Sequence, residues 1–464
     1  MVDILIKNGI IVTMDPQRRL IDNGAVAVEK GKIIDVGASD EIEKKYSARE
    51  VIDATNMLVL PGLINAHTHS GSLTRGIGDD MDLMEAHRKI FDRLDFSVSP
   101  KDVYIAALRS CVEYIRNGTT CIVDQYSYPE EVAKAVEAAG IRGVLSPFMI
   151  DTYTWANEEK PAFVQDTRKV IDDNVNFIKE WHGAAQGRIR SWFGPMHELA
   201  ASKELFIRVV ALAEQYNVGI HVHLAESNTE VQAIKKMYGK RSIEYAYDLG
   251  VLRPGTVVAH ACWLSEHDIT LLAKSGATAV HTPTSEMKLS DGIQPAPRLL
   301  EAGANVALGT DGSGACTPSG DLIREMRIVA LLHKVNYPLD PEIMPAERVL
   351  EMATVNGAKA VMWDNEIGSI EKGKKADIIL VDLKKPHLTP ILRKPKFNVV
   401  SLLVYSAVGS DVDTMIVNGK IIMLHRKILT LNEAKIIEDA QVAAEELIER
   451  TGVVKDIVPW RWSI

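Results

Sequence analysis

Histidine and carboxylate side chains recur at the ends of short apolar runs along this 464-residue chain. The residues that could do chemistry are His67, His69, His223, Glu226, His260 and Asp311. Alternate residues of an extended strand face the same way, so His67 and His69 are able to reach one metal ion. Three imidazoles and one carboxylate form a donor set that suits Zn²⁺, with Fe²⁺, Co²⁺ or Mn²⁺ as alternatives. We therefore expect one divalent metal ion whose bound water has its pKa lowered toward about 7.

The elements that must position these residues alternate between strand and helix from Met57 to Ala360. The runs expected to be strands are Leu58–Ile64, Thr120–Asp124, Gly143–Ile150, Ile189–Phe193, Gly219–Leu224, Thr256–His260, Thr278–His281 and Val306–Gly309. The helical segments between them include Asp102–Arg116, Glu130–Ala139, Ser202–Tyr216 and Glu266–Ser275. This α/β alternation favours a closed (β/α)8 TIM barrel over an open sheet, and barrel strands point their C-terminal ends into one shared mouth. No glycine-rich nucleotide-binding motif follows the first strand.

The two ends of the chain resemble each other, because Leu5–Val12 and Met415–Ile422 both carry Asn-Gly between apolar residues. That pattern predicts a strand, a tight turn and a second strand at each end. We therefore expect one small β-domain, built from residues 1–56 and 363–464, around a barrel of residues 57–362. The C-terminal part should include a charged helix over Leu431–Arg450.

The composition is that of an ordinary soluble protein, with 46% hydrophobic and 25% charged residues and a net charge of -9. This acidic balance and the lack of a basic stripe argue against a nucleic-acid partner. The chain has no apolar run of about 18 residues and does not open like a secretory signal, so no membrane partner is expected. Its four cysteines form no CxxC pair, which favours a reducing, cytoplasmic location.

The motifs His67-Thr68-His69, His223-Leu224-Ala225-Glu226, Ala259-His260 and Gly309-Thr310-Asp311 resemble the signature of the amidohydrolase superfamily. The similarity extends over nearly the whole chain. It is strongest to the branch that holds methylthioadenosine/S-adenosylhomocysteine deaminases, atrazine chlorohydrolase and other triazine hydrolases. The resemblance implies a urease-like β-sandwich beside the barrel, and it implies a homo-oligomer, either a dimer or a tetramer.

The resemblance also implies a role for each residue of the motifs. The metal ligands would be His67, His69, His223 and Asp311. Glu226 would carry a proton from the water to the leaving group, and His260 would orient the nucleophile or polarise the electrophile. Asp311 would also accept a proton from the water. Strand four, from Ile189 to Phe193, offers no lysine to bridge two metals, so one ion per chain is expected.

The substrate pocket should be lined by Phe91, Met196, His197, His281 and Cys316. Nucleoside deaminases of the resembling branch carry a ribose-binding glutamate where Phe91 falls in this sequence. They also carry more polar residues at the positions of Met196 and Cys316. The more apolar pocket favours a small amino- or chloro-substituted nitrogen heterocycle over a ribose-bearing substrate.

Other functions remain as alternatives to that heterocycle hydrolase. The runner-up is a hydrolase of an N-alkyl or N-aryl urea, carbamate or thiocarbamate, because these substrates also hold an electrophilic carbon between heteroatoms. An inactive barrel kept as a binding protein is disfavoured, since every expected position of the site is filled. A deaminase of the cytidine type is disfavoured as well, because the chain has no PCxxC motif.

Overall fold

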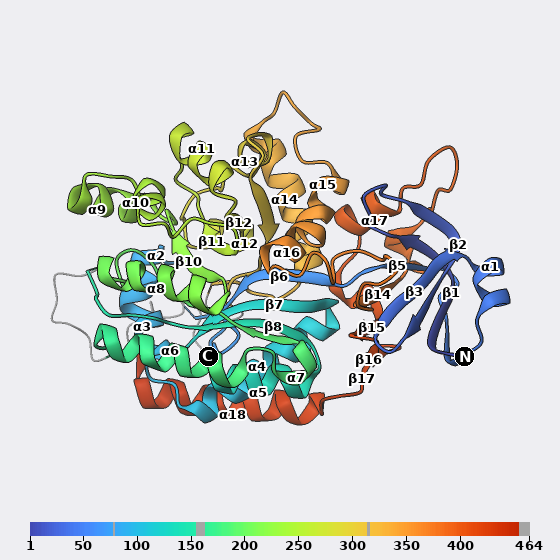
Figure 1. Cartoon of the computed structure of the whole chain (residues 1–464), viewed down its shortest axis with the longest axis horizontal. Helices are drawn as coiled ribbons and strands as arrows, with labels where there is room; N and C mark the ends of the chain where they lie inside the picture. Colours follow the sequence, from blue (N-terminus) through green and yellow to red (C-terminus); the bar gives the residue numbers. More distant parts are fainter. Residues whose placement is uncertain (78, 155–162, 313–315, 454–464) are drawn as a thin grey trace, which may run out of the picture.

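The computed structural model describes residues 1–77, 79–154, 163–312 and 316–453. Within these residues, one mixed nine-stranded sheet is built from both ends of the chain, and the middle of the chain forms two parallel four-stranded sheets. Figure 1 shows the mixed sheet at one end of the molecule and the parallel strands with their helices at the other. None of the described helices is long and apolar enough to cross a bilayer.

The mixed sheet brings the two flanks of the sequence together. Its strands are β1 (Val2–Val12), β2 (Leu20–Glu29), β3 (Lys32–Ala38), β4 (Ala48–Asp53), β5 (Met57–Pro61), β14 (Ile378–Asp382), β15 (Val412–Val417), β16 (Lys420–Leu424) and β17 (Lys427–Ile428). The C-terminal hairpin is confirmed, because β15 and β16 pair around Asn418 and Gly419, which both have positive φ.

The N-terminal hairpin prediction was wrong, because β1 runs straight through Asn8 and Gly9. Asn8 has a φ of 64° at a register shift, which marks a bulge rather than a turn. The bulge lets β1 change partner, from β4 before it to β5 after it. Glycine is required there, since a Cβ on Gly9 would lie 2.6 Å from Val59 Cγ2.

The apolar run Leu58–Ile64 was expected to be a single barrel strand, but it serves both sheets. β5 pairs with β1 and β14 in the mixed sheet, and the barrel begins only with β6. Gly62 separates β5 from β6, and a Cβ at this position would lie 2.2 Å from Thr120. The chain therefore passes from the sheet into the barrel at a tightly packed point.

The parallel strands form the expected (β/α)8 barrel. They are β6 (Leu63–Thr68), β7 (Thr119–Tyr126), β8 (Arg142–Pro147), β9 (Ile189–Ser191), β10 (Ile220–Leu224), β11 (Thr256–His260), β12 (Thr278–His281) and β13 (Asn305–Leu308). The two parallel sheets meet at a bridge between Phe193 and Ile220. On the other side, Asp311 N donates to His67 O at 3.0 Å, just beyond β13 and β6.

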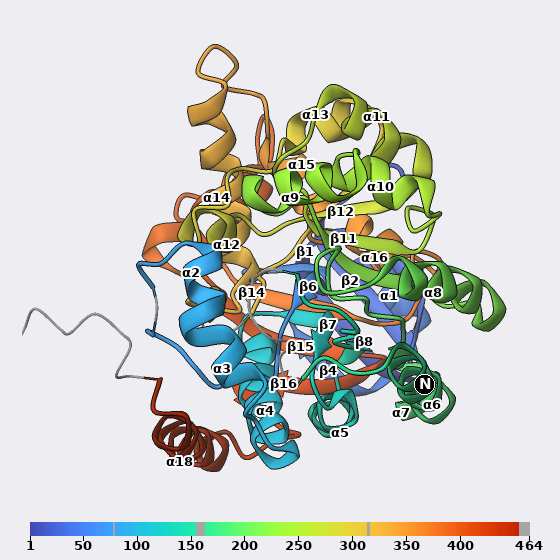
Figure 2. The ribbon, with the colours of Figure 1, turned by 90° about the vertical axis from the view of Figure 1, so that its left-hand side faces the viewer.

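Helices surround the barrel strands, as Figure 2 shows. Four of them confirm the sequence prediction: α4 (Pro100–Arg116), α5 (Pro129–Ala139), α8 (Lys203–Tyr216) and α11 (Glu266–Ser275). The others between the flanks are α2 (Leu83–Ala86), η1 (His87–Phe91), α3 (Asp92–Asp95), α6 (Thr167–Trp181), α7 (Ala184–Gly187), α9 (Asn228–Tyr238), α10 (Ser242–Asp248), α12 (Pro283–Lys288), α13 (Ala296–Glu301), α14 (Leu322–Asn336), α15 (Ala346–Met352) and α16 (Val355–Ala360).

The flanks add helices of their own. These are α1 (Ser39–Lys45), the short turns η2 (Pro386–Leu388) and η3 (Gly409–Asp411), α17 (Val399–Tyr405) and α18 (Glu433–Thr451). The helix expected near the C-terminus is α18, and it packs along α4 of the barrel. Arg116 of α4 binds Glu433 at the start of α18, and Arg450 near its end binds Asp102 at 2.8 Å.

A buried ion pair ties the barrel to the mixed sheet. Arg142 of β8 donates to both carboxylate oxygens of Asp377, at 2.6 and 2.9 Å, and both side chains are only 2% exposed. Asp377 also accepts the backbone N–H of Asn418 at 2.8 Å. We expect Asp377→Ala to destabilise the protein by about 3–5 kcal/mol, because it leaves the Arg142 guanidinium buried without its partner.

Urea unfolding followed by tryptophan fluorescence measures this effect as a lower midpoint. The double variant Arg142→Met/Asp377→Val is the control, since it removes both charges and should recover most of the loss. An Asp377→Ala midpoint equal to that of the wild type would contradict the role given to this pair.

Candidate active site

The residues singled out in the sequence meet at the C-terminal ends of the barrel strands. His67 lies in β6 and His69 just beyond it, His223 lies in β10, and Asp311 follows β13. The potential ligand atoms of His67, His69 and His223 lie within 4.8 Å of one another, and so do those of His67, His260 and Asp311. Asp311 Oδ1 is 3.3 Å from Nε2 of both His67 and His69.

Backbone carbonyls orient two of these imidazoles. Nδ1 of His69 lies 2.6 Å from Gln125 O, and Nδ1 of His223 lies 2.9 Å from Met196 O. A carbonyl only accepts hydrogen bonds, so each Nδ1 carries the proton of the neutral ring. The lone pair of each ring is therefore on Nε2, and these two Nε2 atoms are 3.3 Å apart.

The ring of His67 is oriented by another histidine, His221, instead of by a backbone carbonyl. His67 Nδ1 lies 2.7 Å from His221 Nε2, and His221 Nδ1 lies 3.4 Å from Ser146 Oγ. Since the Ser146 hydroxyl donates to Asp124 O, its oxygen is left to accept from His221 Nδ1. His67 then donates through Nδ1 and keeps the lone pair on Nε2. His221 was not singled out from the sequence, although it stands two residues before His223 on the same face of β10.

The donor set fits a divalent metal ion. Within the described structure, His67 Nε2 is buried and makes no hydrogen bond, which is costly unless another partner binds it. Burial lowers the pKa of His67 to about 3, so the ring is neutral. Burial opposes ionisation of Asp311, but the imidazoles of His67, His260 and His69 beside it hold the pKa of this carboxyl well below its usual value. Neutral imidazoles and an ionised carboxylate are the forms that bind Zn²⁺.

The Asp311 carboxylate is held by two hydrogen bonds. The Ser285 hydroxyl donates to Oδ2 at 2.5 Å, and the backbone N–H of Gly312 donates to Oδ1 at 2.7 Å. Asp311 also has a φ of 67°, a conformation that is unusual for a residue other than glycine. Local backbone strain of this kind is concentrated at functional sites, where surrounding contacts maintain it.

Glu226 and His260 lie beside the ligand cluster. His260 Nε2 is 3.4 Å from Glu226 Oε1 and 4.0 Å from Asp311 Oδ2. Thr282 Oγ1, 2.9 Å from His260 Nδ1, fixes the orientation of the ring. Burial, followed by the charge of Asp291, raises the pKa of Glu226 well above its ordinary value. A buried carboxyl with a raised pKa is suited to carry a proton near neutral pH.

These groups open into a small pocket in the barrel mouth, which we call the reaction pocket. Its cavity volume is about 50 Å³. It is lined by His69, Leu83, His87, Phe91, Asp95, Phe148, Met196, His197, His223, Glu226, His260, Leu289, Asp311 and Cys316. The lining thus includes four of the five residues expected there from the sequence: Phe91, Met196, His197 and Cys316.

His281 is the exception, because it does not belong to this lining. Its Nδ1 lies 2.9 Å from Glu286 Oε2, and its Nε2 lies 3.1 Å from His333 Nε2. Glu286 of α12 folds back toward the end of β12, and the His281 side chain is fully buried between these partners. The packing of two helices on β12 therefore turns this strand-end histidine away from the pocket.

Asp95 is a pocket residue that the sequence reasoning missed. It ends α3, lines the reaction pocket and accepts a hydrogen bond from the Tyr126 hydroxyl at 2.6 Å. Burial raises its pKa to about 6. No motif marks Asp95 in the sequence, since only the docking of α3 over the barrel mouth brings it to the site. The same docking places His87 in the lining, where Asp92 Oδ1 is 3.0 Å from His87 Nδ1.

Comparisons with known proteins point to one enzyme family. Residues 58–422 match the amidohydrolase family model. The chain is 44% identical to a 5'-deoxyadenosine deaminase of Methanosarcina mazei, over 97% of this chain and 100% of that protein. It is 40% identical to a 5-methylthioadenosine/S-adenosylhomocysteine deaminase of Thermoanaerobacter pseudethanolicus, again over 97% of this chain and 100% of the relative.

Solved structures agree in fold. An adenosine deaminase from Xanthomonas campestris with bound zinc superposes with a TM-score of 0.90 at 28% identity, covering 97% of this chain and 99% of that one. The atrazine chlorohydrolase of Arthrobacter aurescens, complexed with zinc, gives a TM-score of 0.87 at 22% identity, over 95% of this chain and 100% of that one. At that identity the second likeness concerns the fold alone.

The chain belongs to the amidohydrolase family. It is a hydrolase that acts on carbon–nitrogen bonds other than peptide bonds, which confirms the reaction class expected from the sequence. The barrel with its β-sandwich is confirmed as well.

Proposed function

We propose that this protein deaminates adenosine-type nucleosides by replacing the ring amino group with the oxygen of water. The observation that carries the proposal is the presence of Glu226 and Asp95 in one pocket. Glu226 is placed to move protons at the ring, and Asp95 is a carboxylate able to accept hydrogen bonds from vicinal ribose hydroxyls. The two deaminases of about 40% identity support the same substrate class.

This proposal differs from the heterocycle without ribose that the sequence favoured. That preference rested on Phe91 occupying the place of a ribose-binding carboxylate. Asp95, one helical turn further along, supplies a carboxylate to the same pocket. Phe91 and Met196 then serve as apolar walls for the purine, and their presence is compatible with a nucleoside substrate.

We propose that His67, His69, His223 and Asp311 hold one divalent ion, with zinc favoured by the donor set. Such an ion, when bound, supplies Lewis-acid activation of water and of the ring carbon. The chain positions its own donors for this in advance, through the carbonyls of Gln125 and Met196 and through His221. These contacts hold every Nε2 lone pair toward the same point.

The protein's own groups manage the protons of the reaction. Glu226 takes one proton from the attacking water and gives it to the ring nitrogen. The second proton of the water, accepted first by Asp311, passes to the departing amine, which leaves as neutral ammonia. His260, held by Thr282, stays within 3.4 Å of Glu226 and orients the nucleophile. Asp311 keeps its charge and is placed to accept the second proton of the water.

His197 is suited to recognise a ring nitrogen. Its Nδ1 accepts the backbone N–H of Leu199 at 3.1 Å, so the proton of the neutral ring is on Nε2. Burial lowers the pKa of His197 well below its ordinary value, which keeps the ring neutral. A neutral Nε2–H donor matches a purine nitrogen acceptor.

A rate panel on metal-replete protein tests the proposal. Ammonia release is followed with adenosine, 5'-deoxyadenosine, methylthioadenosine, S-adenosylhomocysteine, aminotriazines and guanine-like bases. Amine or thiol release is followed with aryl ureas and thiocarbamates. We expect the highest kcat/KM for a nucleoside. Turnover confined to aminotriazines would overturn the proposal in favour of a heterocycle hydrolase. Turnover confined to ureas and thiocarbamates would overturn it in favour of a urea or thiocarbamate hydrolase.

Asp95→Asn tests the ribose contact separately. The amide loses the charge that strengthens hydrogen bonds to hydroxyls, so kcat/KM for adenosine should fall by about 10–100-fold. The rate with 2',3'-dideoxyadenosine, which lacks both hydroxyls, should be the same for the variant and the wild type. Equal losses on both substrates would show that Asp95 acts through the fold and not through ribose.

We further propose that the protein is a cytoplasmic homo-oligomer. The four cysteines are all free thiols in the structure, which suits a reducing compartment. Light scattering of the purified chain distinguishes the expected dimer or tetramer from a monomer.

A further inference from the structure

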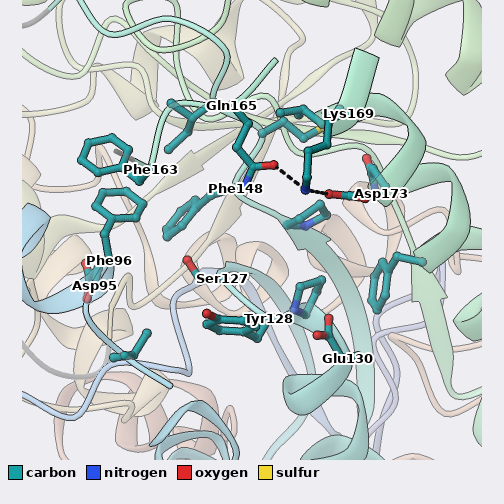
Figure 3. Close-up of a pocket in the computed structure, with 18 residues that line it drawn as sticks. Asp95, Phe96, Ser127, Tyr128, Glu130, Phe148, Phe163, Gln165, Lys169 and Asp173 are labelled. Carbon is teal, nitrogen blue, oxygen red and sulfur yellow. Dashed lines mark hydrogen bonds and ion pairs between the residues drawn. The ribbon is translucent and has the colours of Figure 1, made fainter. Parts of the chain in front are cut away.

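A second and larger cavity opens beside the reaction pocket. We call it the side cavity; it has a volume of about 480 Å³ and lies between the segments that follow β7 and β8 and the start of α6. It shares Asp95 and Phe148, both labelled in Figure 3, with the reaction pocket, so the two spaces adjoin. The reaction pocket alone, at about 50 Å³, is far smaller than the roughly 300–1,000 Å³ of typical small-molecule sites. A substrate larger than its reacting ring must therefore extend into the side cavity.

The position of Asp95 sets which part of a nucleoside enters the side cavity. This inference rests on the proposed function, in which Asp95 binds the 2' and 3' hydroxyls of ribose. The 5' carbon is attached to the ring carbon next to the 3' position. When the hydroxyls are held at the junction and the purine faces Glu226, the 5' substituent points onward past Phe148.

The inner part of the side cavity is aromatic. The rings of Phe96 and Phe163 are stacked with centroids 3.7 Å apart, and the ring of Phe148 is 6.4 Å from that of Phe96. Figure 3 shows these rings on the same side of the cavity as Asp95. Aromatic faces and edges bind alkyl groups and thioether sulfur favourably. This wall suits an alkyl or alkylthio group attached to the 5' carbon.

The outer part of the side cavity is charged, and carboxylates predominate there. Lys169 is the one basic side chain among the described lining residues. Its ammonium group donates to Asp173 at 2.6 Å and to Gln165 at 3.0 Å, so its charge is already matched. Glu130 adds a further carboxylate away from Phe96 and Phe163 (Figure 3). The carboxylates of the cavity would repel an incoming carboxylate, because the charge of Lys169 is already paired. They would attract an ammonium group.

We propose that the side cavity binds the 5' substituent of the substrate, and that it selects 5'-alkyl and 5'-alkylthio groups with neutral or cationic ends over those ending in a carboxylate. The aromatic wall formed by Phe96, Phe148 and Phe163 gives the affinity for the chain. The Lys169–Asp173 pair and Glu130 determine which end group is accepted. This property belongs to the charge and shape of the cavity and is separate from the chemistry at Glu226.

Two analogues of equal length test the charge selection. One is 5'-(3-aminopropylthio)-5'-deoxyadenosine, which ends in an ammonium group, and the other is 5'-(3-carboxypropylthio)-5'-deoxyadenosine, which ends in a carboxylate. Because the charged residues are partly exposed, we expect kcat/KM to favour the amine by about fivefold. The preference should shrink in about 0.5 M salt, which screens exposed charges. Equal values at low salt would overturn the charge selection.

Two variants locate the effect in the side cavity. Asp173→Asn releases Lys169 from its partner, so the carboxylate analogue should improve and the preference for the amine should fall to about twofold or less. Phe163→Ala should lower kcat/KM for methylthioadenosine by about tenfold through lost apolar contact. Neither variant should change the rate with 5'-deoxyadenosine by more than about twofold, since its 5' methyl group barely enters the cavity.

The outcomes separate this inference from the proposed function. If no adenosine derivative releases ammonia, the proposed function fails. If 5'-deoxyadenosine is deaminated but Phe163→Ala and Asp173→Asn leave all substrate ratios unchanged, the side cavity does not bind the 5' group and only this inference is overturned.

Discussion

Glu226→Gln is expected to lower kcat for the best substrate by about 10³-fold or more, while the metal content of the protein stays unchanged. Glutamine preserves the size and one acceptor oxygen of the side chain but cannot take up and return a proton. The residue lies 3.4 Å from His260 and is buried, so bulk water is a poor substitute for it as a proton carrier. Stopped-flow or coupled ammonia assays give the rate, and elemental analysis gives the metal content.

Glu230→Gln is the matched control for this variant. Glu230 is also a buried carboxyl, and its Oε2 accepts the backbone N–H of Glu226 at 2.7 Å. A glutamine oxygen is able to accept the same bond, so the backbone before α9 should keep its position. We expect less than about a tenfold loss. If both variants lose activity equally, the loss comes from disturbing a buried acidic cluster, and Glu226 has no special role in proton transfer.

The sequence was sufficient to predict which residues gather at the barrel mouth, because their signal is local. HxH places His67 and His69 on one face of a strand end through the two-residue period of extended backbone. Glu226 follows the end of β10, beyond Ala225, whose φ is 54°. The barrel turns that local pattern into a shared site, since all eight strands present the same end to the mouth. His67, His69, His223, Glu226 and Asp311 therefore needed no knowledge of distant contacts.

The remaining pocket residues depend on contacts between distant parts of the chain. His221 and His281 both lie in barrel strands, and nothing in their immediate sequence shows that His221 braces His67 while His281 is bound by Glu286 and His333. Asp95 enters the site only because α3 docks over the mouth. The surroundings of His281 and Asp95 depend on how helices pack, and those of His221 on where β6 and β8 lie in the barrel. Sequence periodicity locates these elements along the chain but not in space.

The fold, too, was predictable from the sequence where the signal is local, and not where it depends on distant contacts. Asn-Gly predicted a hairpin at both ends, yet only Asn418-Gly419 forms one. At Asn8-Gly9 the same local preference for positive φ is used as a bulge, because β1 has β4 and β5 available as successive partners. The positive φ was predictable from the sequence, whereas its role as a turn or as a bulge depended on which strands lay alongside.

His67→Ala should abolish both metal binding and activity. His67 Nε2 is a buried donor atom with no hydrogen bond in the described structure, 3.3 Å from Asp311 Oδ1. Removing it deletes one ligand at the centre of the cluster and leaves His221 without its partner. We expect the metal content to fall from about one ion per chain to near zero and kcat/KM to fall by at least about 10³-fold.

His281→Gln is the control that makes this result specific. His281 is also a buried histidine at a strand end of the same barrel, but it faces Glu286 and His333 instead of the ligand cluster. The glutamine variant should keep about one ion per chain and most of the activity, with a lower melting temperature as its main defect. A His67→Ala protein that retained metal and turnover would contradict the proposed ligand set. If the His281→Gln protein lost its metal, the ion would have to lie near His281, and the set of four proposed ligands would be wrong.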